Sequence, residues 1–348
     1  MKWVFCVFNR SVLAVTAILM IVASTSARAV TIDWVTVGDP GNAADDTGYG
    51  AVADSFQIGK YEVTIGQYTD FLNAVAATDT YSLYHPNMAG NLNNAGISQS
   101  GASGSYTYSM IGPSGTTPAG ASSPGNRPIT YVSWFDAARF ANWMQNGQGS
   151  GDTETGAYTL VGGQTSGTAP AKNPGAQFYI PTEDQWYKAA YYKGSGTNAG
   201  YWDYATQSDS DPDNTIGSGT NQANYYTGDY AVTQSVSRSP SQNYLTDVGA
   251  FTNSQSAYGT FDQSGNVFEW NDLTGAAGSL RGFRGGFWDS QSVSELSSST
   301  RVEFQPSDYR YTGFRLASPV PEPATLGLAS GVVLCACGWR VLNRRRRA

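Results

Sequence analysis

The sequence predicts a loop-rich α+β fold with little regular secondary structure. Aromatic residues make up 13% of the chain and charged residues only 14%, which favours a fold held together by aromatic packing. Glycine, serine, threonine and asparagine are spread through the whole length, as is typical of loops. Three segments show the residue pattern of helices, so we expect about three short helices.

The first helix is expected just after a strand-like segment at residues 60–64. Its apolar residues recur at helical spacing: Tyr68, Phe71, Leu72 and Val75. Residues 90–125 and 147–175 are the most polar and glycine-rich stretches, so we expect long surface loops there.

Two further helices have clear start signals. Ser133 begins the second, with Asp136 three residues later, and the pattern ends before Gly147. Thr182 begins the third, with Gln185 in the capping-box position. The residues expected to face inward are Trp134, Ala137, Ala138 and Ala141 in the second helix, and Trp186, Ala189 and Ala190 in the third.

Residues 1–29 have the pattern of a secretory signal peptide. Lys2 and Arg10 precede an apolar run at residues 12–22, and the small residues Ala27 and Ala29 fit a cleavage site after Ala29. The alternative is an uncleaved transmembrane anchor, for which the apolar run is short. Residues 30–318 contain no proline-rich or charged linker, so we expect a single large domain there.

Residues 319–348 contain a second targeting pattern. Val320-Pro321-Glu322-Pro323 precedes an apolar stretch at residues 324–339 and the basic tail Arg344 to Arg347. This resembles the PEP-CTERM sorting signal of Gram-negative bacteria, which implies an exosortase as partner, a transient stay in the inner membrane, and a final place in the cell envelope, at the cell surface or in the extracellular matrix. The stretch is a marginal transmembrane helix. A permanent tail anchor is the alternative.

The central region is strongly acidic. The two terminal segments hold eight of the 20 basic residues and one of the 27 acidic ones, so residues 30–318 keep 12 basic and 26 acidic side chains, a formal charge of −14. Such a charge excludes general affinity for nucleic acid or anionic lipid. Cys6, Cys335 and Cys337 are the three cysteines and all lie in the terminal segments, so the central region has no disulfide or thiolate.

Several ordered motifs resemble the formylglycine-generating enzyme (sulfatase-modifying factor) family. They are Gly59 to Thr64, Pro128 to Trp134, Pro181 to Trp186, Gly265-Asn266-Val267-Phe268-Glu269-Trp270, Arg284-Gly285-Gly286-Phe287-Trp288, Arg301, and Gly313-Phe314-Arg315-Leu316. The resemblance implies a variant of the C-type lectin fold with small antiparallel sheets. Its first and last strands would pair, and here these would be residues 34–37 and 313–317.

The reactive cysteine pair of that family is missing. Counting from Gly285-Gly286, the two cysteines would fall at Ser290 and Glu295. Oxygen side chains neither bind copper as thiolates do nor exchange with a substrate thiol. Phe287 and Phe268 also replace a usual serine and tryptophan. We therefore expect neither copper binding nor the family's oxidation of a sulfatase cysteine.

The resemblance also implies a structural calcium ion. Its ligands would be the carboxylates of Asp262 and Glu269 and the carbonyls of Gly265 and Val267, because calcium prefers hard oxygen donors. The alternative is a hairpin turn at Gly265-Asn266 without an ion. Asn224 and Tyr225 match the start of a second calcium site, which has no clear later acidic ligand.

Other chemistries lack the residues they need. With His85 as the single histidine, histidine-rich metal sites and a Ser-His-Asp triad are difficult to build, and packing or surface roles suit His85 better. Asp289 with Glu295 or Glu303 could form a carboxylate pair, although solvated acids are commoner. Arg284, Arg301 and Arg315 suit structural pairing with buried acids.

Ligand binding in a groove is the function that remains after these exclusions. The residues placed in it are Phe268, Phe287, Trp288, Asp289, Ser290, Glu295, Arg301 and Tyr309, and Trp288, Asp289, Ser290 and Tyr309 are favoured over core roles. The sequence thus predicts an exported, calcium-stabilised, non-catalytic module that binds peptide or glycan. The alternatives are a cysteine-independent oxidase or other enzyme using the same groove, and a structural component of an extracellular matrix.

Overall fold

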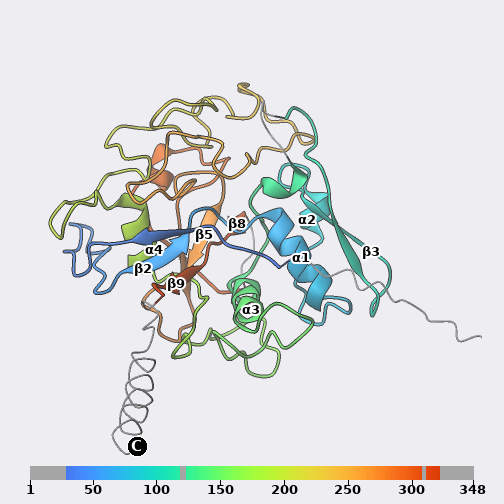
Figure 1. Cartoon of the computed structure of the whole chain (residues 1–348). Helices are drawn as coiled ribbons and strands as arrows, with labels where there is room; N and C mark the ends of the chain where they lie inside the picture. Colours follow the sequence, from blue (N-terminus) through green and yellow to red (C-terminus); the bar gives the residue numbers. More distant parts are fainter. Residues whose placement is uncertain (1–28, 118–122, 308–310, 322–348) are drawn as a thin grey trace, which may run out of the picture.

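The computed structural model describes residues 29–117, 123–307 and 311–321. Within these residues the protein is a loop-rich α+β fold, with four short helices and nine strands of two to four residues (Figure 1). Two turns of 3-10 helix, η1 (Pro124–Asn126) and η2 (Val293–Leu296), complete the regular structure there. The predicted fold class is confirmed.

The described strands form three small sheets. In the first, β1 (Trp34–Val37) pairs antiparallel with β2 (Phe56–Gly59), which pairs on its other side with β9 (Ala317–Pro319). In the second, β3 (Ile97–Ser100) and β4 (Thr107–Met110) make a hairpin.

The third sheet positions the candidate site and has the order β7–β6–β5–β8. Its strands are β5 (Phe268–Asn271), β6 (Arg281–Arg284), β7 (Val302–Phe304) and β8 (Thr312–Gly313). β6 is antiparallel to both neighbours, whereas β5 and β8 run parallel.

The first and last strands share a sheet but do not pair directly, because β2 lies between them. The last strand expected at residues 313–317 is two strands, β8 and β9, with Phe314–Leu316 between them. The strand-like residues 60–64 are likewise irregular. These two segments still bond to each other, from Val63 N to Phe314 O at 2.8 Å. The two segments carry Glu62 and Arg315, and both side chains are buried.

The three predicted helices are confirmed as α1 (Ile65–Val75), α3 (Trp134–Gln145) and α4 (Glu183–Tyr191). Each begins with a complete capping box, formed by the pairs Thr64 and Gln67, Ser133 and Asp136, and Thr182 and Gln185. Such boxes satisfy backbone N–H groups that lack helical partners. The single-turn α2 (Asn87–Gly90) was not predicted, since four residues leave no periodicity to detect.

Aromatic rings join α1 to α3 in the main core. Phe71 lies 5.4 Å from Phe140 and 5.3 Å from Trp143, measured between ring centroids. Phe140 also contacts Phe314, 5.4 Å away, which ties both helices to the C-terminal segment. This is the aromatic packing that the composition predicts.

The loop predictions hold in part. Residues 147–175 contain no helix or strand, as expected, whereas residues 90–125 contain the β3–β4 hairpin. A further segment without helix or strand, residues 192–267, runs between α4 and β5 and loops over the upper side of the molecule in Figure 1. It supplies much of the surroundings of the candidate site.

Among the described residues no helix is long and apolar enough to cross a membrane. The predicted signal peptide apart from Ala29, the predicted C-terminal transmembrane helix and all three cysteines lie outside the described residues.

Candidate functional site

Two glycine turns position the candidate groove. Gly265 N donates to Gly285 O at 2.7 Å, and Trp288 N donates to Asn266 O at 3.0 Å. Gly285 has a φ of +98°, and a Cβ at that position would lie 2.9 Å from the carbonyl oxygen of Gln263. A side chain is therefore excluded there, and the two turns can lie directly against each other.

The two positions where the family resemblance expects cysteines lie together beside this turn. Ser290 Oγ donates to Glu295 Oε2 at 2.7 Å and accepts from Phe287 N at 3.0 Å. Ser290 is fully buried, whereas Glu295, on η2, is half-buried. The counting from Gly285-Gly286 thus identified two side chains that contact each other, and the atoms in contact are oxygens.

A band of three half-buried rings forms the apolar part of the groove. Phe287 stacks on Tyr311 at 4.9 Å and lies 5.1 Å from Phe268. Trp288 was favoured as a groove residue, but its exposed fraction is 0% and its ring stacks on Tyr244 at 4.8 Å. Trp288 therefore underlies the groove as core. Phe287 and Asp289, its neighbours in the chain, are both half-buried.

Asp289 lies at the polar rim. It accepts hydrogen bonds from Tyr230 Oη at 3.0 Å and from Arg238 Nη1 at 3.1 Å. Arg238 also donates to Asn93 Oδ1, so it joins three separate loops. Tyr309, the remaining predicted groove residue, lies outside the described residues.

The acids considered as a catalytic carboxylate pair each have other partners. Glu303 pairs with Arg301, while Asp289 and Glu295 are engaged by other partners. Arg301 also pairs with Glu183 at 2.9 Å, and Arg284 pairs with the same carboxylate at 2.8 Å. Glu183 is 3% exposed. Arg301 is therefore part of a structural ion-pair network, in agreement with the expected pairing of this arginine with a buried acid.

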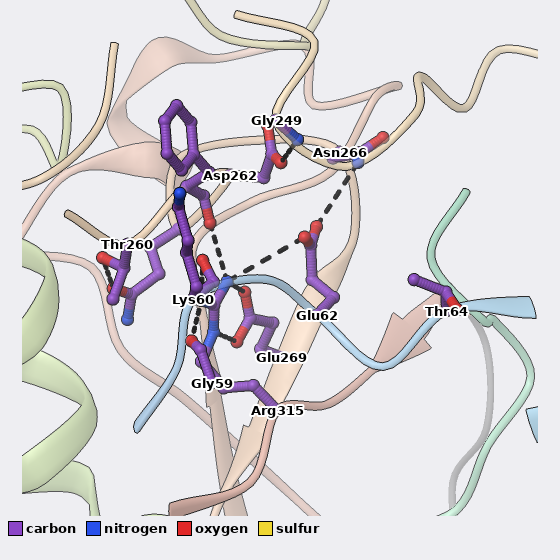
Figure 2. Close-up of polar contacts among 12 residues, drawn as sticks. Gly59, Lys60, Glu62, Thr64, Gly249, Thr260, Asp262, Asn266, Glu269 and Arg315 are labelled. Atoms are coloured by element: carbon purple, nitrogen blue, oxygen red, sulfur yellow. Dashed lines mark hydrogen bonds and ion pairs between the residues drawn. The ribbon is translucent and has the colours of Figure 1, made fainter. Parts of the chain in front are cut away.

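A second polar site lies beneath the Gly265–Asn266 turn (Figure 2). The fully buried Arg315 donates from Nε and Nη2 to the two oxygens of Glu269, at 2.6 and 2.5 Å. Trp186 Nε1 adds a third bond to Glu269 at 2.9 Å. The remaining donors of Arg315 reach the carbonyl oxygens of Gly59 and Phe261, each at 2.9 Å.

Two more acids complete what we call the buried carboxylate cluster, namely Glu62, Asp262 and Glu269 around Arg315. Glu62 Oε1 accepts from Asn266 Nδ2 at 3.3 Å. Glu62 Oε2 lies 4.0 Å from Arg315 Nη2 and has no hydrogen-bond partner in the described part of the chain. Asp262 accepts from Gly249 N at 2.6 Å.

The cluster has more negative than positive charge. Three ionised carboxylates against one guanidinium leave a formal charge of −2. Burial, followed by repulsion from Asp262 and Glu269, raises the pKa of Glu62 well above its ordinary value. Burial also raises the pKa of Asp262 to about 6. Either bound protons or a bound cation would relieve this excess charge.

The predicted calcium ligands fit this cluster in part. Asp262, Gly265, Val267 and Glu269 come from one continuous turn and strand, and hard oxygen donors with excess negative charge suit Ca²⁺. Glu269 already accepts three hydrogen bonds, which leaves about one of a carboxylate's four acceptor directions. No group of three or more histidine, cysteine or acidic side chains in the described ranges could hold a metal. An ion here would therefore depend on the backbone carbonyls.

The residues of the second predicted calcium site have protein partners. Asn224 Nδ2 donates to Tyr244 O at 2.9 Å and to Asn266 Oδ1 at 3.0 Å. Tyr225 O accepts from Asn214 Nδ2 at 3.2 Å. Asn224 thus extends the polar network of the buried carboxylate cluster.

His85 takes part in packing. Its ring stacks on Tyr131 at 5.3 Å, and its Nδ1 accepts from Asn87 N at 3.1 Å. Burial lowers the pKa of His85. These contacts agree with the structural reading of this residue.

Sequence reasoning missed Glu62, Asn266 and Arg238. Glu62 stands between the apolar side chains of Tyr61 and Val63, and an acid in such a setting is a signal of buried pairing. Arg238 gives no comparable signal, because its partners lie about 50 and 145 residues away in the chain.

The chain was compared with known proteins. A family model described as "Sulfatase-modifying factor enzyme 1-like domain" matches residues 37–320. No curated protein matches the chain.

Solved structures with a similar fold include the crystal structure of CarF, at 21% identity and a TM-score of 0.46, covering 84% of this chain and 99% of that chain. Treponema denticola variable protein 1 has 19% identity and a TM-score of 0.47, with 85% and 98% covered. PvdO from Pseudomonas aeruginosa has 18% identity and a TM-score of 0.39, with 83% and 92% covered.

Proposed function

The chain belongs to the sulfatase-modifying factor enzyme 1-like family, and from this premise we propose that it is an exported, non-catalytic binding module that lacks thiol chemistry. The module binds peptide or glycan in the groove formed by the aromatic band and its polar rim. Its fold is stabilised by calcium at the buried carboxylate cluster.

The observation that carries the proposal is the contact between Ser290 and Glu295. Thiolates bind copper and exchange with other thiols, because sulfur is a soft ligand and a good nucleophile. Here the two side chains meet through oxygen atoms 2.7 Å apart, and Ser290 has an exposed fraction of 0%. A buried hydroxyl that is bonded on both sides is poorly placed to attack a substrate.

Thiol oxidation provides the direct test. The purified full chain would be incubated with a Cys-x-Pro-x-Arg peptide, copper and O₂, with an active member of the family as positive control. We expect no conversion of the peptide cysteine by mass spectrometry and no stoichiometric copper binding. Multiple turnovers, or one tightly bound copper per chain, would refute the non-catalytic proposal.

Binding in the groove is supported by the half-buried rings of Phe268, Phe287 and Tyr311, since aromatic anchors with polar neighbours dominate binding surfaces. Peptide and glycan arrays would identify the ligand class. Phe287→Ala is expected to weaken binding at least tenfold. The control is Tyr106→Ala, which removes a partly buried ring packed against the main core and should leave binding unchanged. Equal loss in both variants, or no loss in either, would place the ligand elsewhere.

Calcium binding is supported by the formal charge of −2 in the cluster and by its hard oxygen donors. Chelation of calcium is expected to lower the melting temperature of the full chain, because a ligand of the folded state alone stabilises it. Asp262→Asn should abolish this difference. If the melting temperature is the same with calcium and with chelator, the calcium proposal fails and the binding proposal stands.

Export and sorting are proposed from the terminal segments of the sequence. The expected mature protein begins at Val30 and loses its C-terminal segment to an exosortase-type enzyme at the Pro-Glu-Pro motif. Intact-mass measurement on protein recovered from the native cell envelope tests both cuts. A mass that corresponds to residues 30–348 would instead favour a permanent C-terminal anchor.

A further inference from the structure

A polar pocket of about 370 Å³ lies beside the buried carboxylate cluster. Its volume is in the range of about 300–1,000 Å³ that is usual for small-ligand sites. The lining comes from the N-terminal segment, the segment that leads into helix α1, and two loops, namely residues 31–33, 61–64 and 67, Asn126, Val248 and Leu316. The pocket thus shares Glu62 with the cluster.

Glu62 brings a buried carboxylate oxygen without a hydrogen bond to this wall. The residue is 1% exposed, and its Oε1 accepts from Asn266 Nδ2 at 3.3 Å. Its Oε2 has no hydrogen-bond partner in the described part of the chain. Figure 2 shows the Glu62 side chain between Arg315 and Asn266. A buried charged oxygen in this state is costly, and a donor that reaches it from the pocket would remove the cost.

Arg315 does not supply the missing hydrogen bond, although its Nη2 lies 4.0 Å from Glu62 Oε2. All five N–H groups of this guanidinium have other acceptors. Two bonds go to the carboxylate of Glu269, and the other three go to the backbone carbonyls of Gly59, Lys60 and Phe261. Glu62 Oε2 is therefore left to a donor from outside the chain.

The rest of the lining suits a cation on an apolar stem. Among the described residues that line the pocket there is no lysine, arginine or histidine. Asp33 is exposed in the lining and adds a second negative charge. Val63 and Leu316 are buried and Ile32 is half-buried, so the same wall offers apolar surface.

The walls of the pocket are held in place before any ligand binds. Lys60 N donates to Asp33 O at 2.7 Å, and Gln67 Nε2 donates to Thr31 O at 2.8 Å. On the opposite segment, Val248 N donates to Asn126 O at 3.0 Å. A preformed site loses less free energy to loop ordering on binding.

We propose that this pocket binds a primary ammonium group on an aliphatic stem, the chemistry of a lysine side chain, with the ammonium against Glu62 Oε2. Charge-assisted hydrogen bonds of this kind are the strong ones. A guanidinium favours both oxygens of one carboxylate, and Oε1 is already taken by Asn266, whereas a point-like ammonium needs only one oxygen.

A metal ion fits this pocket less well than an ammonium group. Calcium takes about six to eight oxygen ligands. No group of three or more histidine, cysteine or acidic side chains that could hold a metal occurs in the described ranges. The carbonyls of Gly265 and Val267, on which the calcium of the proposed function depends, do not line the pocket. The ammonium site therefore goes beyond that calcium site and beyond the aromatic groove.

The first test varies the ligand. Isothermal titration of the full chain with acetyl-Gly-Lys-Gly-amide is expected to show saturable binding. The norleucine peptide keeps the stem without the ammonium group, and the arginine peptide replaces it with a guanidinium, so both should bind at least about tenfold more weakly. 1-Aminopentane distinguishes the two sources of such a group. Equal affinity would point to a free alkylamine and tighter peptide binding to a lysine of a polypeptide, and both agree with the ammonium assignment.

The second test varies the protein. Glu62→Gln should weaken binding of the lysine peptide at least about tenfold, while its amide oxygen can still accept from Asn266. Its melting temperature shows whether the fold is kept. Asp33→Lys changes an exposed residue and should weaken binding about twofold to fivefold. Asp54→Lys is the matched control, because it makes the same charge reversal at an exposed position outside the lining and should leave binding unchanged.

Equal binding of the lysine and norleucine peptides by the unaltered chain would overturn the proposal whatever the variants do. Unchanged binding in a folded Glu62→Gln variant, or equal loss in Asp33→Lys and Asp54→Lys, would overturn it as well. If Phe287→Ala abolishes binding of the lysine peptide and the pocket variants do not, the groove of the proposed function stands and this inference fails.

Discussion

Single side chains set the chemistry of the groove. Ser290 and Glu295 keep the contact that the family motif leads one to expect, yet an O–H···O⁻ bond cannot be oxidised to a cross-link as a thiol pair can. The contact therefore holds η2 against the Gly285–Gly286 turn without any redox sensitivity.

Ser290→Ala is expected to destabilise the fold by about 1–3 kcal/mol, because it leaves the amide of Phe287 without its acceptor and removes a bond to a carboxylate. Urea denaturation at pH 7 measures the change. Ser292→Ala is the control, since this hydroxyl is exposed and pairs only with Ser294. A Ser290 variant as stable as the control would mean that the contact contributes little.

Arg315 is expected to contribute more to the stability of the fold than Ser290 does. Arg315→Met would leave Glu62, Asp262 and Glu269 without their cation, and breaking a buried pair in this way costs about 3–5 kcal/mol. Lys193→Met is the comparison, since Lys193 pairs at 3.8 Å with Asp209, whose side chain is 54% exposed, and surface pairs contribute about 0–1 kcal/mol. Similar unfolding free energies for the two variants would contradict the central role of Arg315.

At the scale of elements, the capping box at the start of helix α3 is expected to make the stability of the fold depend on pH. Asp136 accepts from Ser133 N at 2.9 Å and from Ser133 Oγ at 2.7 Å, and its burial raises its pKa to about 7. The unfolded chain releases this proton near pH 4, whereas the folded chain keeps it to about pH 7. The folded state therefore binds more protons in this interval, and its stability falls as the pH rises.

Asp136→Asn should remove this slope, because asparagine keeps an acceptor for Ser133 and carries no charge. Compared with wild type, the variant is expected to gain stability between pH 4 and pH 7, by about 1.4 kcal/mol for each unit by which the two pKa values differ. Urea denaturation across this range, with the exposed Asp54→Asn as control, measures the effect. A difference from wild type that is constant with pH would show that Asp136 titrates normally.

At the scale of the whole molecule, the C-terminal strand closes the fold. β9 pairs with β2, and Ala317 exchanges two backbone hydrogen bonds with Tyr179, at 2.6 and 3.0 Å. Contacts between segments so distant in the chain are what make a domain unfold as one unit.

Ending the chain at Leu316 should therefore lower the melting temperature sharply or abolish cooperative unfolding, because β2 loses a partner and becomes an edge strand. Ending it at Pro321 keeps β9 and should leave the melting temperature close to that of the full chain. Circular dichroism on both truncations checks this. Equal melting temperatures would show that β9 is dispensable.

The sequence by itself predicted the elements whose signals are local. The three capping boxes and the apolar spacing of α1, α3 and α4 depend on residues within about one turn of each other, so each helix start could be identified directly. The Ser290–Glu295 contact could be located as well, because both positions are counted along one short stretch from a glycine turn.

Only the tertiary structure decided which residues are covered and which are paired. Trp288 and Phe287 are neighbours in the chain, yet one is core and the other half-exposed. The same holds for the position of β2 between β1 and β9, and for the meeting of Glu62, Asp262 and Glu269 at Arg315, which joins segments more than 200 residues apart. Such contacts depend on how loops without periodic patterns pack. The packing free energy that selects them comes from residues far apart in the chain, so no short stretch of sequence predicts it.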